Sequence, residues 1–310
     1  MTATANPAWP ALPLVRWQDT YATLHMWTQI VGKTRLALAP MENHWWQVAL
    51  YVTPRGLTTS AIPYGERTFA VDFDFIDHTL WVRASDGATR GLALVARSVA
   101  DFYEEYMTLL RSLGFEVTLM PSPVEVQTAI PFGEDREHAS YDPGAVQSWW
   151  QILLQVDRVL KGFRGHFLGK ASPVHFFWGS FDLAATRFSG RAAPRHAGGA
   201  PHCPDYVMVE AYSHECSSCG FWPGGGAIEE PAFYAYAYPE PPGYADHPVR
   251  PQGAYYHRGI REFVLPYEVV RTASAPDEAL LEFAQSTYDA AAEHGHWDHA
   301  ALDREQGKPP

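Results

Sequence analysis

The most reactive residue types of the chain gather in one stretch, SHECSSCGFWPGGG at positions 213–226. Within it, His214 and Glu215 are the first candidates for general acid and base, because an imidazole and a carboxylate beside a glycine loop are readily shifted towards neutral pKa values. Strand alternation places adjacent residues on opposite faces, so joint action on one atom requires a bulge. The structural alternative is that Glu215 pairs with an arginine and His214 caps a strand.

The same stretch contains half of a common zinc motif. Cys216 and Cys219 form a Cys-x-x-Cys followed by Gly, and His214 lies on the same side of an extended strand as Cys216. Cys203 completes a Cys3His set, so zinc is one hypothesis. The spacing is irregular, and a glycine-supported turn with small buried thiols is the alternative. A redox pair is disfavoured, because GFWPGGG cannot continue as the helix that such a motif requires.

A second group of candidates lies on SPVHFFWGSFDLAATRF, which predicts one strand over residues 173–187. Alternation places Trp178 and Asp182 on one face. A carboxylate at mid-strand, with Arg187 nearby, is either half of a buried ion pair or a ligand-facing acid, so we assign both residues to substrate positioning and Asp182 also to catalysis. The other candidates for substrate binding are His175, Trp178, Trp222 and Cys219.

Aromatic residues around these positions suit a flat or cationic organic ligand. Trp45, Gln47 and Tyr51 in the first half of the chain are also polar or aromatic, which favours a cleft between two sheets. The alternative is a tryptophan-rich core that needs no ligand.

These candidates require a framework of strands between helices, and the hydrophobic pattern supplies it. Helical spacing predicts a helix over about 20–32, another opened by Ser98 with Asp101, a long one opened by Asp142 and Pro143, and a last one over about 274–293. Alternating segments with Gly, Pro and Asp punctuation predict strands between them. The expected fold class is α+β.

The two halves show similar motifs in the same order, which indicates an internal duplication. The matched pairs are His44 with His175, His78 with His214, Arg90 with Arg261, and Ser98 with Ser274. We expect two pseudo-symmetric helix, antiparallel-sheet, helix units packed together. Residues 1–113 form the first unit and 114–142 a linker. Residues 143–310 form the second unit, which carries long loop insertions and the candidate site.

The composition of the chain limits the classes of partner and the cellular compartment that we expect. The 310 residues are 46% hydrophobic and 14% aromatic, so the chain folds. A net charge of -12 and the lack of basic runs disfavour nucleic acid as a partner. The sequence shows no signal peptide and no apolar run long enough to span a membrane, and three cysteines fit a reducing compartment. We therefore expect a cytoplasmic protein with no membrane partner.

Several long motifs carry a resemblance that covers nearly the whole chain. They are TYATLHMWTQIVGK, NHWWQVALYV, HASYDP, SPVHFFWGSFDLA and SHECSSCGFWPGGG. With them the chain resembles a bacterial family for which no activity is known, so the resemblance implies none here. The family keeps the position of Cys219 more reliably than that of Cys216, which weakens a zinc site with four protein ligands.

The leading hypothesis is a small-molecule enzyme that uses His214 and Glu215 for acid–base chemistry in a cleft of the second unit. A non-catalytic protein that binds a small molecule or cofactor is the first alternative. A protein interaction module is the second.

Overall fold

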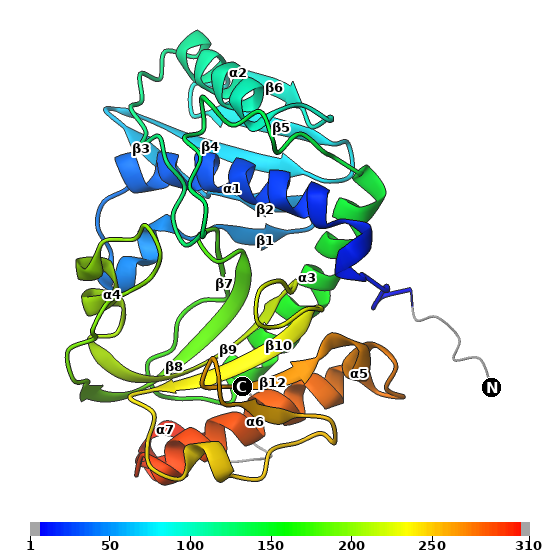
Figure 1. Ribbon diagram of the computed structural model, residues 1–310. Coiled ribbons are helices and arrows are strands. Elements are labelled where there is room, and N and C mark those ends of the chain that lie inside the picture. The colour runs from blue at the N-terminus through cyan, green and yellow to red at the C-terminus, as the bar shows by residue number, and fades with distance from the viewer. Residues whose placement is uncertain (1–6, 305–310) are drawn as a thin grey trace.

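The computed structural model describes residues 7–304, and within them the chain forms two six-stranded sheets with helices packed on them (Figure 1). Hydrogen bonding joins the first sheet in the order β1-β2-β4-β5-β6, with β3 paired to β4. Its strands are β1 Tyr51–Thr53, β2 Gly56–Thr58, β3 Ile62–Tyr64, β4 Arg67–Asp74, β5 Thr79–Ala84 and β6 Thr89–Ala93. All its strand pairs are antiparallel.

The second sheet has the order β11-β12-β10-β9-β8-β7, and it is also antiparallel. Its strands are β7 His175–Phe177, β8 Asp182–Ala192, β9 His214–Trp222, β10 Ala232–Tyr238, β11 Tyr255–His257 and β12 Glu262–Pro266. The two sheets meet at one edge of each, where Leu50 and Phe176 exchange backbone hydrogen bonds of 2.9 and 2.8 Å. The α+β class is therefore confirmed.

Helices α1 and α2 pack on the first sheet, and α3 and α6 pack on the outer face of the second (Figure 1). The helices are α1 Gln18–Leu38, α2 Val99–Ser112, α3 Pro143–Gly165, α4 Asp205–Ala211, α5 Tyr267–Arg271, α6 Pro276–His294 and α7 His299–Leu302. Short 3-10 turns are η1 Leu14–Arg16, η2 Asn43–Val48 and η3 Tyr244–Asp246. No helix in the described part of the chain is long and apolar enough to cross a membrane.

Local sequence accounts for the starts of the two best-defined helices. The Ser98 hydroxyl accepts a hydrogen bond from the Asp101 N–H and begins α2. The Asp142 carboxylate accepts from Gly144 and Ala145, and Pro143 occupies the first turn of α3. Both predicted caps are thus present.

The order of elements is parallel in the two halves. Each half has a helix, a five-strand meander and a further helical segment: α1, β1-β2-β4-β5-β6 and α2, then α3, β7-β8-β9-β10-β12 and α5 with α6. The matched histidines, however, are not equivalent. His44 lies in η2 with a left-handed φ of 59°, whereas His175 opens β7. His78 follows β4, whereas His214 begins β9. The histidine pairs therefore give no support to duplication, and the division at residues 113 and 143 stays a prediction.

The strand predicted over residues 173–187 is a hairpin instead. Strands β7 and β8 are joined by a tight turn, in which Phe181 has a left-handed φ of 62°, and Phe177 pairs with Asp182. The turn resets the alternation, so Asp182 shares a face with Phe177, and faces assigned by parity across the turn are wrong. Trp178 lies in the turn, where its indole N–H donates to the Val48 carbonyl at 2.7 Å.

Candidate functional site

A cavity of about 430 Å³ lies on the face of the second sheet that is opposite to α3 and α6. Its floor is formed by side chains of β8, β9, β10 and β12, and its roof by η2, α4 and residue Glu125. Most of its walls are apolar or aromatic, including Phe177, Phe188, Val207, Met208, Trp222 and Phe233. The size and the lining are those of a small-molecule pocket.

Three carboxyl groups face this cavity, from Glu125, Asp182 and Glu262, and no lysine or arginine is among its described lining residues. They come from three separate parts of the chain: the segment between α2 and α3, the start of β8 and the start of β12. The fold therefore gathers negative charge in an apolar surrounding without the cation that normally accompanies it.

Asp182 is the most deeply placed of the three, with only 6% of its surface exposed. Its carboxylate accepts hydrogen bonds from the Tyr234 hydroxyl and from the Ser180 hydroxyl, the latter at 3.0 Å. Burial raises the pKa of Asp182 to about 6, although these two hydrogen bonds favour the ionised form. Burial and the Asp182 charge also raise the pKa of Tyr234 well above its ordinary value, so this phenol stays a proton donor.

Glu262 has neither a hydrogen bond nor an ion pair to another side chain in the described residues. Its electrostatic partners are Asp182 and the phenols of Tyr212, Tyr234 and Tyr244. Burial, followed by repulsion from Asp182, raises its pKa to about 7. A carboxyl that titrates near neutral pH and has free lone pairs is suited to accept and return a proton.

Glu125 reaches the cavity from an irregular segment. Its own N–H donates to the Pro201 carbonyl at 2.7 Å, and its φ of 58° is left-handed. Gly179 lies opposite, and a Cβ there would lie 2.1 Å from a Glu125 carboxylate oxygen, so a larger residue would displace this side chain. Desolvation by the surrounding protein and the Asp182 charge raise the pKa of Glu125, and a hydrogen bond with Ser180 opposes that rise.

A family model matches residues 9–304 of the chain. The chain belongs to DUF5996, a family of unknown function. No curated protein and no solved structure matches it. The resemblance drawn from the sequence motifs is thereby confirmed, and the site of this DUF5996 chain has to be interpreted from its own geometry.

The predicted acid–base pair is not assembled in the cavity. His214 is exposed at the start of β9, next to His44, and is not among the lining residues. Glu215 is held by Arg191, with an N–O distance of 2.6 Å, and accepts a hydrogen bond from Ser189 at 2.8 Å. The structural alternative for Glu215, a pair with an arginine, is the observed arrangement.

Two of the predicted substrate contacts face away from the cavity. Arg187 lies on the opposite face of β8 from Asp182, where its guanidinium packs against the rings of Phe163 and Tyr288 and donates to the Phe163 carbonyl. The suggested contact between Arg187 and Asp182 is therefore wrong, because the two residues are five positions apart on one strand and an odd offset places side chains on opposite faces. Cys219 likewise faces the helices, and burial raises its pKa to about 12.

Of the remaining candidates, Trp222 lines the cavity, and Trp178 and His175 do not. His175 is fully buried beside the Tyr51 hydroxyl, 3.4 Å away, and burial lowers its pKa to about 3. It remains neutral and belongs to the packing between the two sheets.

The zinc hypothesis is contradicted by the arrangement of the cysteines. Cys216 lines the cavity, whereas Cys219 packs towards the helices on the other face of β9, and Cys203 lies in the loop before α4. Among the described residues, no group of three or more His, Cys, Asp or Glu side chains could hold a metal ion. The set Cys203, His214, Cys216 and Cys219 therefore does not converge.

Proposed function

We propose that the chain is a small-molecule enzyme that acts on an organic cation in this cavity. The observation that carries the proposal is the presence of three carboxyls, and of no lysine or arginine, among the described lining residues of one aromatic pocket. A ligand with a positively charged amine supplies the missing countercharge.

The electrostatics favour such a ligand over a neutral or anionic one. Burial raises the pKa values of Asp182 and Glu262 to about 6 and 7, so their charge is partly relieved by protonation. A bound ammonium group stabilises the ionised forms instead, because opposite charges attract strongly where water is scarce. An anion would meet only repulsion.

The walls supply a matching surface for the rest of the ligand. Phe177, Phe188 and Trp222 present rings around the carboxyls. Aromatic faces attract cations, and their area also binds the apolar part of an organic amine. The volume of about 430 Å³ lies within the roughly 300–1,000 Å³ of small-molecule pockets.

The carboxyls differ in what they can do. Asp182 has both oxygens engaged by Tyr234 and Ser180, so it is a fixed charge that orients the cation. Glu262 has no such partner and titrates near neutral pH, so it is the acid–base group of the proposal. In this proposal Glu262 takes the part that the sequence pattern suggested for His214 and Glu215.

The alternative is a protein that binds the same cation without changing it. The engaged carboxylate of Asp182 favours this reading, since a fully hydrogen-bonded acid is suited to holding a ligand rather than to proton transfer. Both proposals share the ligand class and differ only in the role of Glu262.

A ligand panel tests the shared part. Hexylamine, hexanol and hexanoate have nearly the same shape but carry a positive, a neutral and a negative head group; benzylamine, benzyl alcohol and benzoate form a second such set. We expect both amines to raise the melting temperature near neutral pH, and the alcohols and carboxylates to leave it unchanged. Equal shifts with alcohols and amines would contradict cation binding.

A second measurement separates enzyme from binding protein. The most stabilising amine is incubated with wild type and with Glu262→Gln, with and without a heat-treated metabolite extract, and is followed by NMR. Turnover by wild type that falls about 100-fold or more in Glu262→Gln supports the enzyme. An amine that binds both proteins and is unchanged by both supports the binding protein.

A further inference from the structure

A second cavity, of about 460 Å³, lies directly beside the first. Four residues line both cavities, namely Tyr212, Tyr236, Ile260 and Glu262. The two spaces therefore share a wall, and Glu262 faces both of them.

The shared wall is built around a pair of tyrosines. Their hydroxyl oxygens are 2.9 Å apart and form one hydrogen bond. His196 stacks on Tyr212 from the side of the second cavity, with ring centroids 4.7 Å apart, and Tyr234 stacks on Tyr236 from the side of the first. A single hydroxyl–hydroxyl bond contributes only about 1 kcal/mol net, so a ligand with its own polar group can replace it at little cost.

The chemistry of the second cavity is different from that of the first. Arg261 and Glu240 form an ion pair there with an N–O distance of 3.2 Å, and the Tyr256 hydroxyl donates to Glu240 at 2.6 Å. Charges of both signs are thus present and neutralise one another. Apart from Glu262 on the shared wall, the lining therefore offers hydrogen-bond donors and acceptors without a net demand for charge.

We propose that the second cavity is a further subsite of the same binding site, and that the ligand is an elongated amine with a polar, uncharged far end. The ammonium group lies at Asp182 in the first cavity, an apolar spacer passes Glu262 and Ile260, and a hydroxyl or similar group reaches Arg261 and Glu240. This inference rests on the proposed function, because it assumes that the first cavity binds the cation.

Two homologous series of named probes test the proposal by calorimetry with the full chain. One series runs from ethylamine to octylamine, and the other from ethanolamine to aminooctanol, in which a hydroxyl replaces the end methyl group. Short members of both series should bind alike. Once the chain is long enough for the hydroxyl to reach the second cavity, the amino alcohol should bind about three- to tenfold more tightly than the alkylamine of the same length, which is the effect of one hydrogen bond.

A matched pair of variants locates the effect. Arg261 and Arg258 lie in the same turn and both form exposed ion pairs, but only Arg261 lines the second cavity. Arg261→Gln should abolish the advantage of the long amino alcohols and leave alkylamine affinity unchanged. Arg258→Gln should keep both the advantage of the long amino alcohols and the affinity for alkylamines.

Each outcome has a separate meaning. Equal affinity of amino alcohols and alkylamines at every length overturns the second subsite and leaves the proposed function standing. A loss in Arg261→Gln that is the same for both series also overturns it. If no amine of either series binds, the proposed function itself fails.

Discussion

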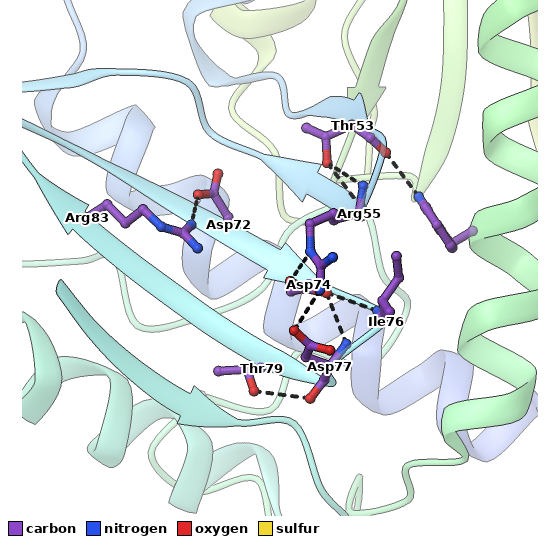
Figure 2. Close-up of polar contacts among 10 residues, drawn as sticks. Thr53, Arg55, Asp72, Asp74, Ile76, Asp77, Thr79 and Arg83 are labelled. Atoms are coloured by element: carbon purple, nitrogen blue, oxygen red, sulfur yellow. Dashed lines mark hydrogen bonds and ion pairs between the residues drawn. The ribbon is translucent and has the colours of Figure 1, made fainter.

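Asp74 in the first sheet and Asp182 in the second are almost equally buried, at 4% and 6% exposure, but their surroundings differ. Arg55 contacts the Asp74 carboxylate at 2.5 Å, and the N–H groups of Ile76 and Asp77 donate to it at 3.0 Å each (Figure 2). Burial would raise the pKa of Asp74, but these contacts outweigh it and lower the pKa below its ordinary value. At Asp182, the effect of burial is larger than that of the hydrogen bonds from Tyr234 and Ser180, so the pKa is raised.

The same contrast extends to the neighbouring acids. In the first sheet, Asp77 shares Arg55 with Asp74, and Asp72 pairs with Arg83 (Figure 2). In the cavity of the second sheet, Glu262 has no cation at all among the described residues. This contrast is the basis of our proposal that the counter-ion of the cavity carboxyls is a ligand.

The largest stability effect is expected at the paired acid. Asp74→Asn removes the charge that Arg55 contacts but keeps the shape, and should lower the free energy of unfolding by about 1–3 kcal/mol at neutral pH. Asp182→Asn removes a charge that the surrounding protein stabilises poorly. It should change the free energy of unfolding by less than about 1 kcal/mol, in either direction. Urea unfolding of both variants measures the difference. A large loss in Asp182→Asn would mean that this carboxylate is structural.

A smaller effect is expected in the pH dependence of stability. The folded-state pKa values of Asp182 and Glu262, about 6 and 7, lie above the unfolded values of about 4. Between these limits the folded forms of the two carboxyls bind more protons, so their contribution to stability rises as the pH falls from about 7 to about 5, by about 1–3 kcal/mol. The buried His25 and His175 oppose this rise, because burial lowers their pKa values to about 4 and about 3. Asp74 acts in the opposite sense, and its contribution is lost only below about pH 4.

The double variant Asp182→Asn/Glu262→Gln is the control for this pH effect. The change in stability from about pH 7 to about pH 5 should be more favourable in wild type than in the double variant, because only wild type has the two raised carboxyl pKa values. If wild type and double variant show the same slope, the two carboxyls do not carry raised pKa values.

Much of the fold was predictable from local signals. The caps at Ser98 and Asp142 act within a few residues, so the sequence pattern was sufficient for α2 and α3. The hairpin between β7 and β8 was missed, because an aromatic run hid the turn at Gly179 and Ser180. That turn decides which face Asp182 occupies. The predicted link to Arg187 fails for another reason, because the two residues are five positions apart on β8 and therefore lie on opposite faces.

The site was predictable only in part, for a related reason. Asp182 was found because a carboxylate in an apolar strand is conspicuous, and Glu262 carries the same signal in REFVLP, where it was overlooked. Glu125 has no local signal, since an irregular segment places it. His214 and Glu215 were chosen for their reactive types, but only tertiary structure sets their exposure and their partners.

The most direct test of the account is the calorimetric affinity of hexylamine for wild type, Asp182→Asn and Asp74→Asn at neutral pH. Loss of the buried cavity charge should weaken binding about 30-fold or more, corresponding to at least about 2 kcal/mol. The folded fraction of Asp74→Asn should bind within about twofold of wild type, because its carboxylate is remote from the cavity. If Asp182→Asn binds hexylamine as tightly as wild type does, the proposal that the cavity carboxyls bind a cation is contradicted.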